Sequence, residues 1–303
     1  MTAGFKIKTS KLMMVLAIMT FIIGATAVFY SVTLFLANFR PSEEPTVLRV
    51  TQWSGYMVAS NVEIDVKNRS SVVSSVSGSW TVPDVNPSEN NTFSGIWVGI
   101  GGYGEETLIQ AGTEQEYVNG RAVYYMWYEL VPDYLIRIPS VRVKPNDTIT
   151  ASISLVNENT NTWTITIKDV TRNEQFKKTV IYNSSRLSAE WVVERPKVNG
   201  TVSTLADFES VTFTECVATL DDVTGPIGNF SYAQLVMQEN DTPLVSVSRL
   251  DNGESGFTVS YLEQPSQTTL ANDSTQDVAT KTVTFSINTK KFCSKKPPNF
   301  SVF

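Results

Sequence analysis

Histidine is absent from the whole 303-residue chain. Without it, Ser-His-Asp and Cys-His relays, histidine zinc sites and imidazole general bases are excluded. The chain also lacks the Asp-Thr-Gly and Asp-Ser-Gly signatures of paired-aspartate peptidases, a P-loop and a Gly-x-Ser-x-Gly motif. Any acid–base chemistry therefore falls to carboxylates, lysine or tyrosine, and we expect neither a metal site nor a cofactor.

Basic residues are scarce in the middle of the chain. Residues 46–280 hold 15 lysines and arginines against 28 aspartates and glutamates, a charge of −13, although the net charge of the whole chain is −6. Nucleic-acid binding needs a basic stripe, so we exclude nucleic acid as a partner. An acidic surface suits low pH, where protonation of carboxylates relieves their mutual repulsion.

Helical periodicity is also missing, because no long window after residue 45 shows the 3.6-residue apolar pattern. Runs of period two, rich in Val, Ile, Thr and aromatic residues, predict strands instead. They cover Tyr124–Leu130, Thr148–Val156, Trp163–Asp169, Ala189–Glu194, Ser210–Ala218 and Gly256–Leu262. Strands without helices must cover each other. We therefore predict an all-β, antiparallel two-sheet β-sandwich over residues 46–263, followed by a polar and then basic tail at 264–303.

One long charge-free segment, residues 12–39, precedes this domain. It is long enough to cross a bilayer, and the three lysines within residues 1–11 predict a cytoplasmic flank. Two alternatives stay open: an uncleaved transmembrane anchor, or a signal segment cut near Ala25–Ala27. In both, residues 40–45 form a short polar linker. The domain then lies outside the cell, on the membrane surface or secreted, and we expect it to be a monomer.

Two further features agree with export. Nine Asn-x-Ser/Thr sequons follow the apolar segment and are acceptor sites for N-glycosylation; they start at Asn68, Asn90, Asn146, Asn183, Asn199, Asn229, Asn240, Asn272 and Asn299. The two cysteines, Cys216 and Cys293, form either one disulfide between domain and tail or two unpaired thiols.

The segment Gly99–Gly104 matches the GxGxxG dinucleotide fingerprint in its letters. That fingerprint must open a helix inside a βαβ unit, whereas the residues that follow read as strand and turn. We therefore predict a glycine-rich hairpin here.

Two predicted strands carry polar and aromatic residues on a single face. Alternation puts Tyr125, Trp127 and Glu129 on one side of the first strand. In the second strand, Glu190 faces away from Trp191. On this pattern alone, Glu190 is either a solvent-facing strand residue or part of a site.

The sequence resembles the glutamic peptidase (eqolisin) family in six separated places, in the family's order. They are Gln52–Tyr56, Val76–Pro83, Trp97–Ile100 with Leu108–Gly112, Trp127–Glu129 with Pro132–Tyr134, Ala189–Trp191, and Ala206–Phe208 with Val211–Thr214. The resemblance implies a concanavalin-like or jelly-roll sandwich of two curved antiparallel sheets, whose concave face holds an extended peptide. It also implies a pepstatin-insensitive acid endopeptidase that acts on polypeptides.

The resemblance extends to individual site residues. Gln110 and Glu190 fall on the family's catalytic glutamine and glutamate. The residues that match the lining or support of the peptide cleft are Trp53, Trp97, Trp127, Glu129 and Glu114, the last standing where relatives carry an aspartate. The chain departs from the family at Gly101, where an acidic residue is common.

A glutamine and a glutamate can hydrolyse a peptide bond without histidine or metal. Ionised Glu190 would activate a water molecule as general base, with neighbouring N–H donors holding its charge in acid. The neutral amide of Gln110 would donate a hydrogen bond to the oxyanion, a contact worth about 3 to 4 kcal/mol in comparable sites. Glu190 would then return the proton to the leaving amine.

Two other functions compete with this interpretation. A carbohydrate-binding or glycan-cleaving sandwich would use Glu129 with Glu190 as its carboxyl pair, but it leaves the block around Gln110 without an explanation. A non-catalytic cell-surface domain would keep the fold without needing both Gln110 and Glu190.

Overall fold

The computed structural model describes residues 45–63, 68–70, 72–87 and 91–263. The predicted anchor or signal segment and the predicted tail lie outside these residues, as do Cys293 and the sequons at Asn90, Asn272 and Asn299. Within the described ranges, no helix has the length and apolar character needed to span a membrane.

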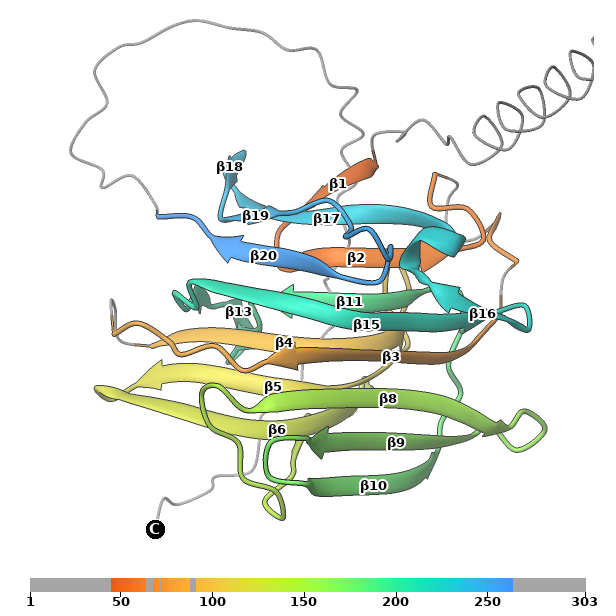
Figure 1. Ribbon diagram of the computed structural model, residues 1–303, viewed down its shortest axis with the longest axis horizontal. Helices are drawn as coiled ribbons and strands as arrows, with labels where there is room; N and C mark the ends of the chain where they lie inside the picture. Colours follow the sequence, from red (N-terminus) through yellow and green to blue (C-terminus); the bar gives the residue numbers. More distant parts are fainter. Residues whose placement is uncertain (1–44, 64–67, 71, 88–90, 264–303) are drawn as a thin grey trace, which may run out of the picture. The chain divides into compact units, whose positions relative to one another are not determined.

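A ten-stranded sheet forms one layer of the domain (Figure 1). Its strand order is β1-β17-β2-β11-β4-β5-β6-β7, with β14 beside β4 and β18 beside β17. The strands are β1 (Thr46–Val50), β2 (Trp53–Ala59), β4 (Thr92–Gly101), β5 (Leu108–Val118), β6 (Arg121–Val131), β7 (Ile136–Arg137), β11 (Ala189–Glu194), β14 (Thr204–Leu205), β17 (Ser231–Glu239) and β18 (Thr242–Pro243).

An eight-stranded sheet forms the other layer and lies over the first (Figure 1). Its order is β10-β9-β8-β3-β15-β20-β19, with β16 beside β15. The strands are β3 (Val73–Thr81), β8 (Thr148–Asn157), β9 (Thr162–Asp169), β10 (Glu174–Ile181), β15 (Ser210–Leu220), β16 (Val223–Pro226), β19 (Val245–Val247) and β20 (Phe257–Tyr261). The small pair β12 (Lys197–Val198) and β13 (Thr201–Val202), and the short 3-10 helix η2 (Ile227–Asn229), complete the described elements.

The predicted all-β class and the six predicted strand runs are confirmed, since each run coincides with β6, β8, β9, β11, β15 or β20 within a few residues. Asn119 and Gly120 close the β5–β6 hairpin with φ of 52° and 71°, the left-handed conformation that these residue types tolerate. The glycine-rich segment covers the last residues of β4 and the start of the loop to antiparallel β5, and it opens no helix, as predicted.

The prediction of purely antiparallel sheets is wrong at two positions. Strand β1 runs parallel to β17, and β14 runs parallel to β4. Strands β1 and β2 flank β17 on opposite sides. Because the chain turns around the end of β17 between them, β2 is antiparallel to β17 and β1 is left parallel.

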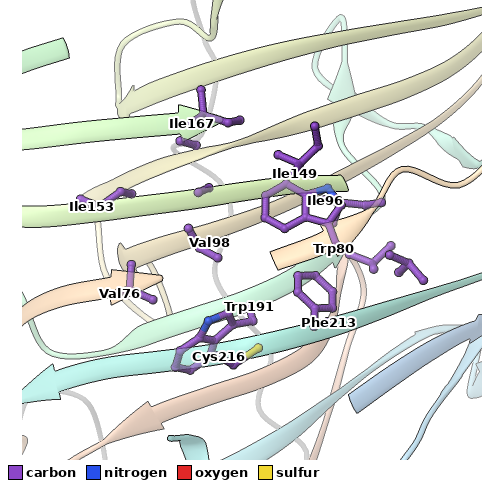
Figure 2. Close-up of a cluster of buried hydrophobic side chains, with 14 of the residues drawn as sticks. Val76, Trp80, Ile96, Val98, Ile149, Ile153, Ile167, Trp191, Phe213 and Cys216 are labelled. Atoms are coloured by element: carbon purple, nitrogen blue, oxygen red, sulfur yellow. The ribbon is translucent and has the colours of Figure 1, made fainter. Parts of the chain in front are cut away.

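The apolar core lies between the two sheets (Figure 2). Trp80 of β3 and Phe213 of β15 contribute from the eight-stranded sheet, whereas Val98 of β4 and Trp191 of β11 contribute from the ten-stranded sheet. The indole N–H of Trp191 donates to the carbonyl oxygen of Ser77 at 2.7 Å, and this hydrogen bond links the two sheets. Cys216 is fully buried in the same core.

The opposite face of the ten-stranded sheet, here called the outer face, is not a plain solvent surface. A second apolar cluster lies on it, with members such as Met57, Trp97, Trp127 and Val192. These residues alternate along their strands with core residues, as period two requires. The outer face therefore buries side chains as well, and the predicted site residues lie among them.

Candidate active site

The two predicted catalytic residues lie in one row across the outer face. In the sheet register, Glu190 of β11 pairs with Gly99 of β4, Gly99 pairs with Gln110 of β5, and Gln110 pairs with Glu129 of β6. Directly opposed residues in antiparallel strands project to the same face. Residues 80 positions apart in the sequence are thereby brought to the same level of the sheet, with one glycine between them.

Gly99 leaves the position between the pair without a side chain of its own. A Cβ atom there would lie 2.8 Å from Cδ1 of Leu108 and 2.9 Å from Cζ3 of Trp97. Such distances are too short for ordinary van der Waals contact. The close approach of these two side chains therefore requires glycine at this position.

Gln110 is fixed by its neighbour in the row. Its amide Nε2 donates to Oε2 of Glu129 at 2.6 Å. Its Oε1 is buried and has no hydrogen-bond partner among the described residues. The amide nitrogen carries two hydrogens, so Gln110 can still offer the second one as a donor, in addition to the unpartnered Oε1 acceptor.

Glu190 is fully buried, and both of its carboxyl oxygens lack a hydrogen-bond partner among the described residues. Burial raises its pKa well above the ordinary value, and the charge of Glu105 raises it further. The nearby Ser188 hydroxyl, although outside hydrogen-bond geometry, and the Arg69 guanidinium act in the opposite direction. The expectation that N–H donors hold the charge of Glu190 is not met, because no such donor bonds to it within the part of the chain that the structure describes.

Three tryptophans lie beside the row on the outer face. Trp97 of β4 and Trp127 of β6 flank Gly112 in the next row of the register. Trp53 of β2 packs edge-on against Trp97 with ring centroids 5.1 Å apart. The structure thus brings all three predicted tryptophans to the face that carries Gln110 and Glu190.

Glu114 lies on the same face but four residues along β5 from Gln110. Burial and the charges of Glu116 and Glu194 raise its pKa well above the ordinary value. Beside it, the Tyr125 hydroxyl donates to Glu116 at 2.6 Å. About four residues of extended strand, roughly 13 Å, separate Glu114 from the row of the candidate pair. Glu114 therefore belongs to a second acidic group and does not touch that pair directly.

Several residues that sequence reasoning did not single out also shape the site. Glu194 accepts a hydrogen bond from the indole N–H of Trp97 at 2.8 Å. Its spacing of four residues from Glu190 on one strand was a usable signal, because period two puts both on one face. Glu105 and Arg69 act on Glu190 from loops, where alternation offers no comparable signal.

Burial also makes Glu129 and Glu105 weaker acids. It raises the pKa of each to about 7; the charge of Glu194 adds to the effect at Glu129, whereas Arg69 opposes it at Glu105. Both groups are therefore neutral through most of the acid range. The outer face carries far less charge at low pH than its number of carboxyl groups suggests.

Comparison with known proteins identifies the family of this chain. A family model described as the Peptidase A4 family matches residues 51–261. Aspergillopepsin-2 from Aspergillus niger is 30% identical over 128 residues, which cover 41% of this chain and 45% of that protein. The chain thus spans less than half the length of this curated relative.

Solved structures of eqolisins share the fold. Scytalido-glutamic peptidase, solved with a transition state analog inhibitor, superposes with a TM-score of 0.59 at 20% identity, over 70% of this chain and 98% of its own. Aspergilloglutamic peptidase from Aspergillus niger superposes with a TM-score of 0.51 at 25% identity, over 56% of this chain and 99% of its own. The predicted resemblance is confirmed: the chain belongs to the Peptidase A4 family.

Proposed function

We propose that this protein is a glutamic endopeptidase in which Glu190 is the general base and Gln110 stabilises the oxyanion. The observation that carries the proposal is the row Glu190–Gly99–Gln110 on the outer face. Strands lie about 4.8 Å apart, so the backbones that carry the two side chains are about 10 Å apart. In this proposal the scissile peptide group and the attacking water bind between the ends of the two side chains.

Unpartnered polar atoms beside the row fit a peptide backbone. Oε1 of Gln110 is an acceptor and Nε1 of Trp127 is a donor, and both are buried without a partner among the described residues. An extended peptide offers an N–H and a C=O in every residue, so it can satisfy both atoms. The same two atoms would otherwise each leave a buried polar group unpaired.

The pKa values of the carboxyl groups favour activity on the acid side of neutrality. Because burial raises the pKa of Glu190, the ionised base is a minority at low pH and its population grows as the pH rises. Near pH 7, Glu105 and Glu129 ionise and add negative charge around the site. We expect the rate to rise through the acid range and to fall as these two groups ionise.

The protein acts outside the cell in this proposal, either on a membrane anchor or after secretion. The charge-free segment 12–39 and the lysines before it support export. The six sequon asparagines within the described residues are all exposed, as glycosylation requires; they are Asn68, Asn146, Asn183, Asn199, Asn229 and Asn240. Its substrate is a polypeptide, and pepstatin, which targets paired aspartates, should not inhibit it.

The glycan-cleaving alternative has less support from the geometry. Glu129 and Glu190 lie three strands apart in the register, roughly 14 Å between backbones. Glycosidase carboxyl groups are usually about 5 to 9.5 Å apart. In addition, Glu129 is engaged by the Gln110 amide. The row therefore favours a glutamate and an amide as the reacting pair.

The full-length chain, solubilised in mild detergent, tests the proposal. Cleavage of a denatured protein substrate is measured from pH 2 to 8 with pepstatin present, for the wild type and for Glu190→Gln. Removal of the base should lower kcat at least about 10³-fold while the circular dichroism spectrum stays unchanged.

Glu239→Gln is the matched control, since it removes an exposed carboxylate that pairs with Arg195 at the end of β17. Its activity should equal that of the wild type. A folded wild type that cleaves nothing at any pH would refute the peptidase. Full activity in Glu190→Gln would refute the assignment of the base.

A further inference from the structure

The phenol of Tyr182 lies within the backbone ladder next to the candidate pair. Tyr182 directly follows β10 and belongs to the connection from the eight-stranded sheet to β11. Its hydroxyl accepts a hydrogen bond from the backbone N–H of Leu108 at 2.8 Å and donates one to the carbonyl oxygen of Val131 at 2.5 Å. Leu108 is the first residue of β5 and Val131 the last of β6.

These two backbone groups belong to residues that face each other across the β5–β6 ladder. The two-residue turn of the β5–β6 hairpin is closed by the pair Val118 and Arg121. In such a hairpin this pair exchanges N–H···O bonds, and every second pair along the ladder does the same. The pairs Gln110–Glu129 and Leu108–Val131 lie an even number of residues from that closing pair, so both are of the hydrogen-bonded kind. The Tyr182 hydroxyl therefore lies at the last rung of the ladder, one hydrogen-bonded pair beyond Gln110–Glu129.

The same connection is tied to the strand that carries Glu190. The carbonyl oxygen of Ser188 accepts from the N–H of Gly101 at the end of β4, at 2.9 Å. The N–H of Ser185 donates to the Thr107 hydroxyl, also at 2.9 Å. Residues 182–188 thus join the start of β11 to the loop and strand ends that flank Gln110.

We propose that Tyr182 is a positioning residue that fixes the Gln110 amide relative to Glu190. The hydroxyl fixes the separation of β5 and β6 at the end of their ladder, because it bonds to both a backbone donor of β5 and a backbone acceptor of β6. Without it, either the two buried backbone groups lose their partner or the strands close toward each other. Both changes move the Gln110–Glu129 pair, and displacements of about 1 Å in a catalytic group cost up to about 10²-fold in rate.

Burial, with a further contribution from the charge of Glu129, raises the pKa of Tyr182 to about 12. The phenol therefore keeps the proton that it donates to Val131 throughout the pH range in which the protein is proposed to act. Tyr182 therefore acts on the position of Gln110 and does not transfer a proton in the reaction.

Tyr182→Phe tests the inference, because it removes the hydroxyl and keeps the ring. Tyr124→Phe is the matched control: the Tyr124 hydroxyl also makes two hydrogen bonds, to Asp84 at 2.6 Å and from the N–H of Val85 at 3.1 Å, but near the opposite end of β6. We expect Tyr182→Phe to lower kcat about tenfold or more with KM changed less than about twofold. Tyr124→Phe should leave kcat per folded molecule unchanged.

A second readout does not depend on activity. In full-length protein labelled with ¹⁵N-glutamine, the side-chain amide signals of Gln110 are assigned by their loss in Gln110→Ala. They should shift in Tyr182→Phe and stay in place in Tyr124→Phe.

The inference rests on the proposed function for its effect on rate, and the two can fail separately. If the wild type cleaves nothing, the proposed function fails while the Gln110 signals still decide whether Tyr182 positions the amide. Unchanged Gln110 signals in Tyr182→Phe would overturn the inference, whatever happens to the rate. A kcat equal to that of Tyr124→Phe in an active enzyme would also overturn it.

Discussion

The two faces of the ten-stranded sheet use the same strands for different purposes. On the inner face, Val98 and Trp191 join the apolar core between the sheets. On the outer face, one residue away along the same strands, Gly99 and Glu190 belong to the row of the candidate site. Both faces are buried, so burial alone does not separate stability from function. What differs is the hydrogen bonding of the polar groups. The indole of Trp191 on the inner face has a hydrogen-bond partner, whereas the carboxyl group of Glu190 has none among the described residues.

The largest effect should come from the inner face. Trp191→Ala removes a fully buried indole and its hydrogen bond to Ser77. Such a cavity typically costs about 3 to 5 kcal/mol of unfolding free energy. Urea denaturation at pH 5 measures it, with Glu190→Gln at the adjacent position as comparison. A loss below about 1 kcal/mol in Trp191→Ala would show that the inner face is not the stabilising one.

The next effect should come from the amide on the outer face. Gln110→Ala removes the proposed oxyanion donor, so kcat should fall about 10²- to 10³-fold. Gln115→Ala is the matched control, since Gln115 is a buried glutamine of the same strand whose side chain faces the core and donates to Thr113 at 2.7 Å. The control should lose stability but keep its kcat per folded molecule. Equal kcat values for the two variants would remove the distinction between the faces.

The stability of the protein should fall as the pH rises from about 4.5 to 7. The pKa of Glu129 is raised to about 7 in the folded protein from an ordinary value of 4.5. Below 4.5 the group is protonated in both states, so its full contribution is present. Between 4.5 and 7 the unfolded chain releases this proton while the folded protein holds it, and stability is lost at about 1.4 kcal/mol per pH unit for the group.

Urea denaturation of Glu190→Gln at several pH values from 4 to 8 measures this trend without self-cleavage. In that background, Glu129→Gln should reduce the fall of the unfolding free energy with pH. Glu105, with a pKa also raised to about 7, should account for part of the fall that is left. If the unfolding free energy instead rises between pH 4.5 and 7, the carboxyl groups of the outer face are not held in their protonated form in the folded protein.

Alternation in the sequence was enough to predict which face each strand residue occupies. It placed Trp127 with Glu129 and separated Glu190 from Trp191, and the register bears this out. It did not place Glu190 at the level of Gln110, because strand order and register depend on pairing between segments 80 residues apart. Only the resemblance to a known family linked the two residues before the structure did.

Loops and connections were the part that the sequence did not reveal. Arg69 and Glu105 lie near Glu190 in irregular segments, and the Tyr182 hydroxyl bonds to backbone groups of β5 and β6 from a connecting segment. No periodicity governs such contacts. The expectation that N–H donors would keep Glu190 charged failed for the same reason, because it required knowing which backbone groups remain unpaired beside the strand.

The smallest expected effect concerns the alkaline side of the activity profile. Glu129 accepts from the Gln110 amide, and its pKa is raised to about 7 by burial and the charge of Glu194. When Glu129 ionises, it holds that amide more strongly and adds negative charge where the oxyanion would form. Glu129→Gln keeps a carbonyl acceptor and removes the titration. Profiles of kcat/KM from pH 3 to 9 should therefore keep the acid limb set by Glu190 and extend about one pH unit further on the alkaline side. An unchanged alkaline limb would mean that Glu105, or another group on the outer face, controls it instead.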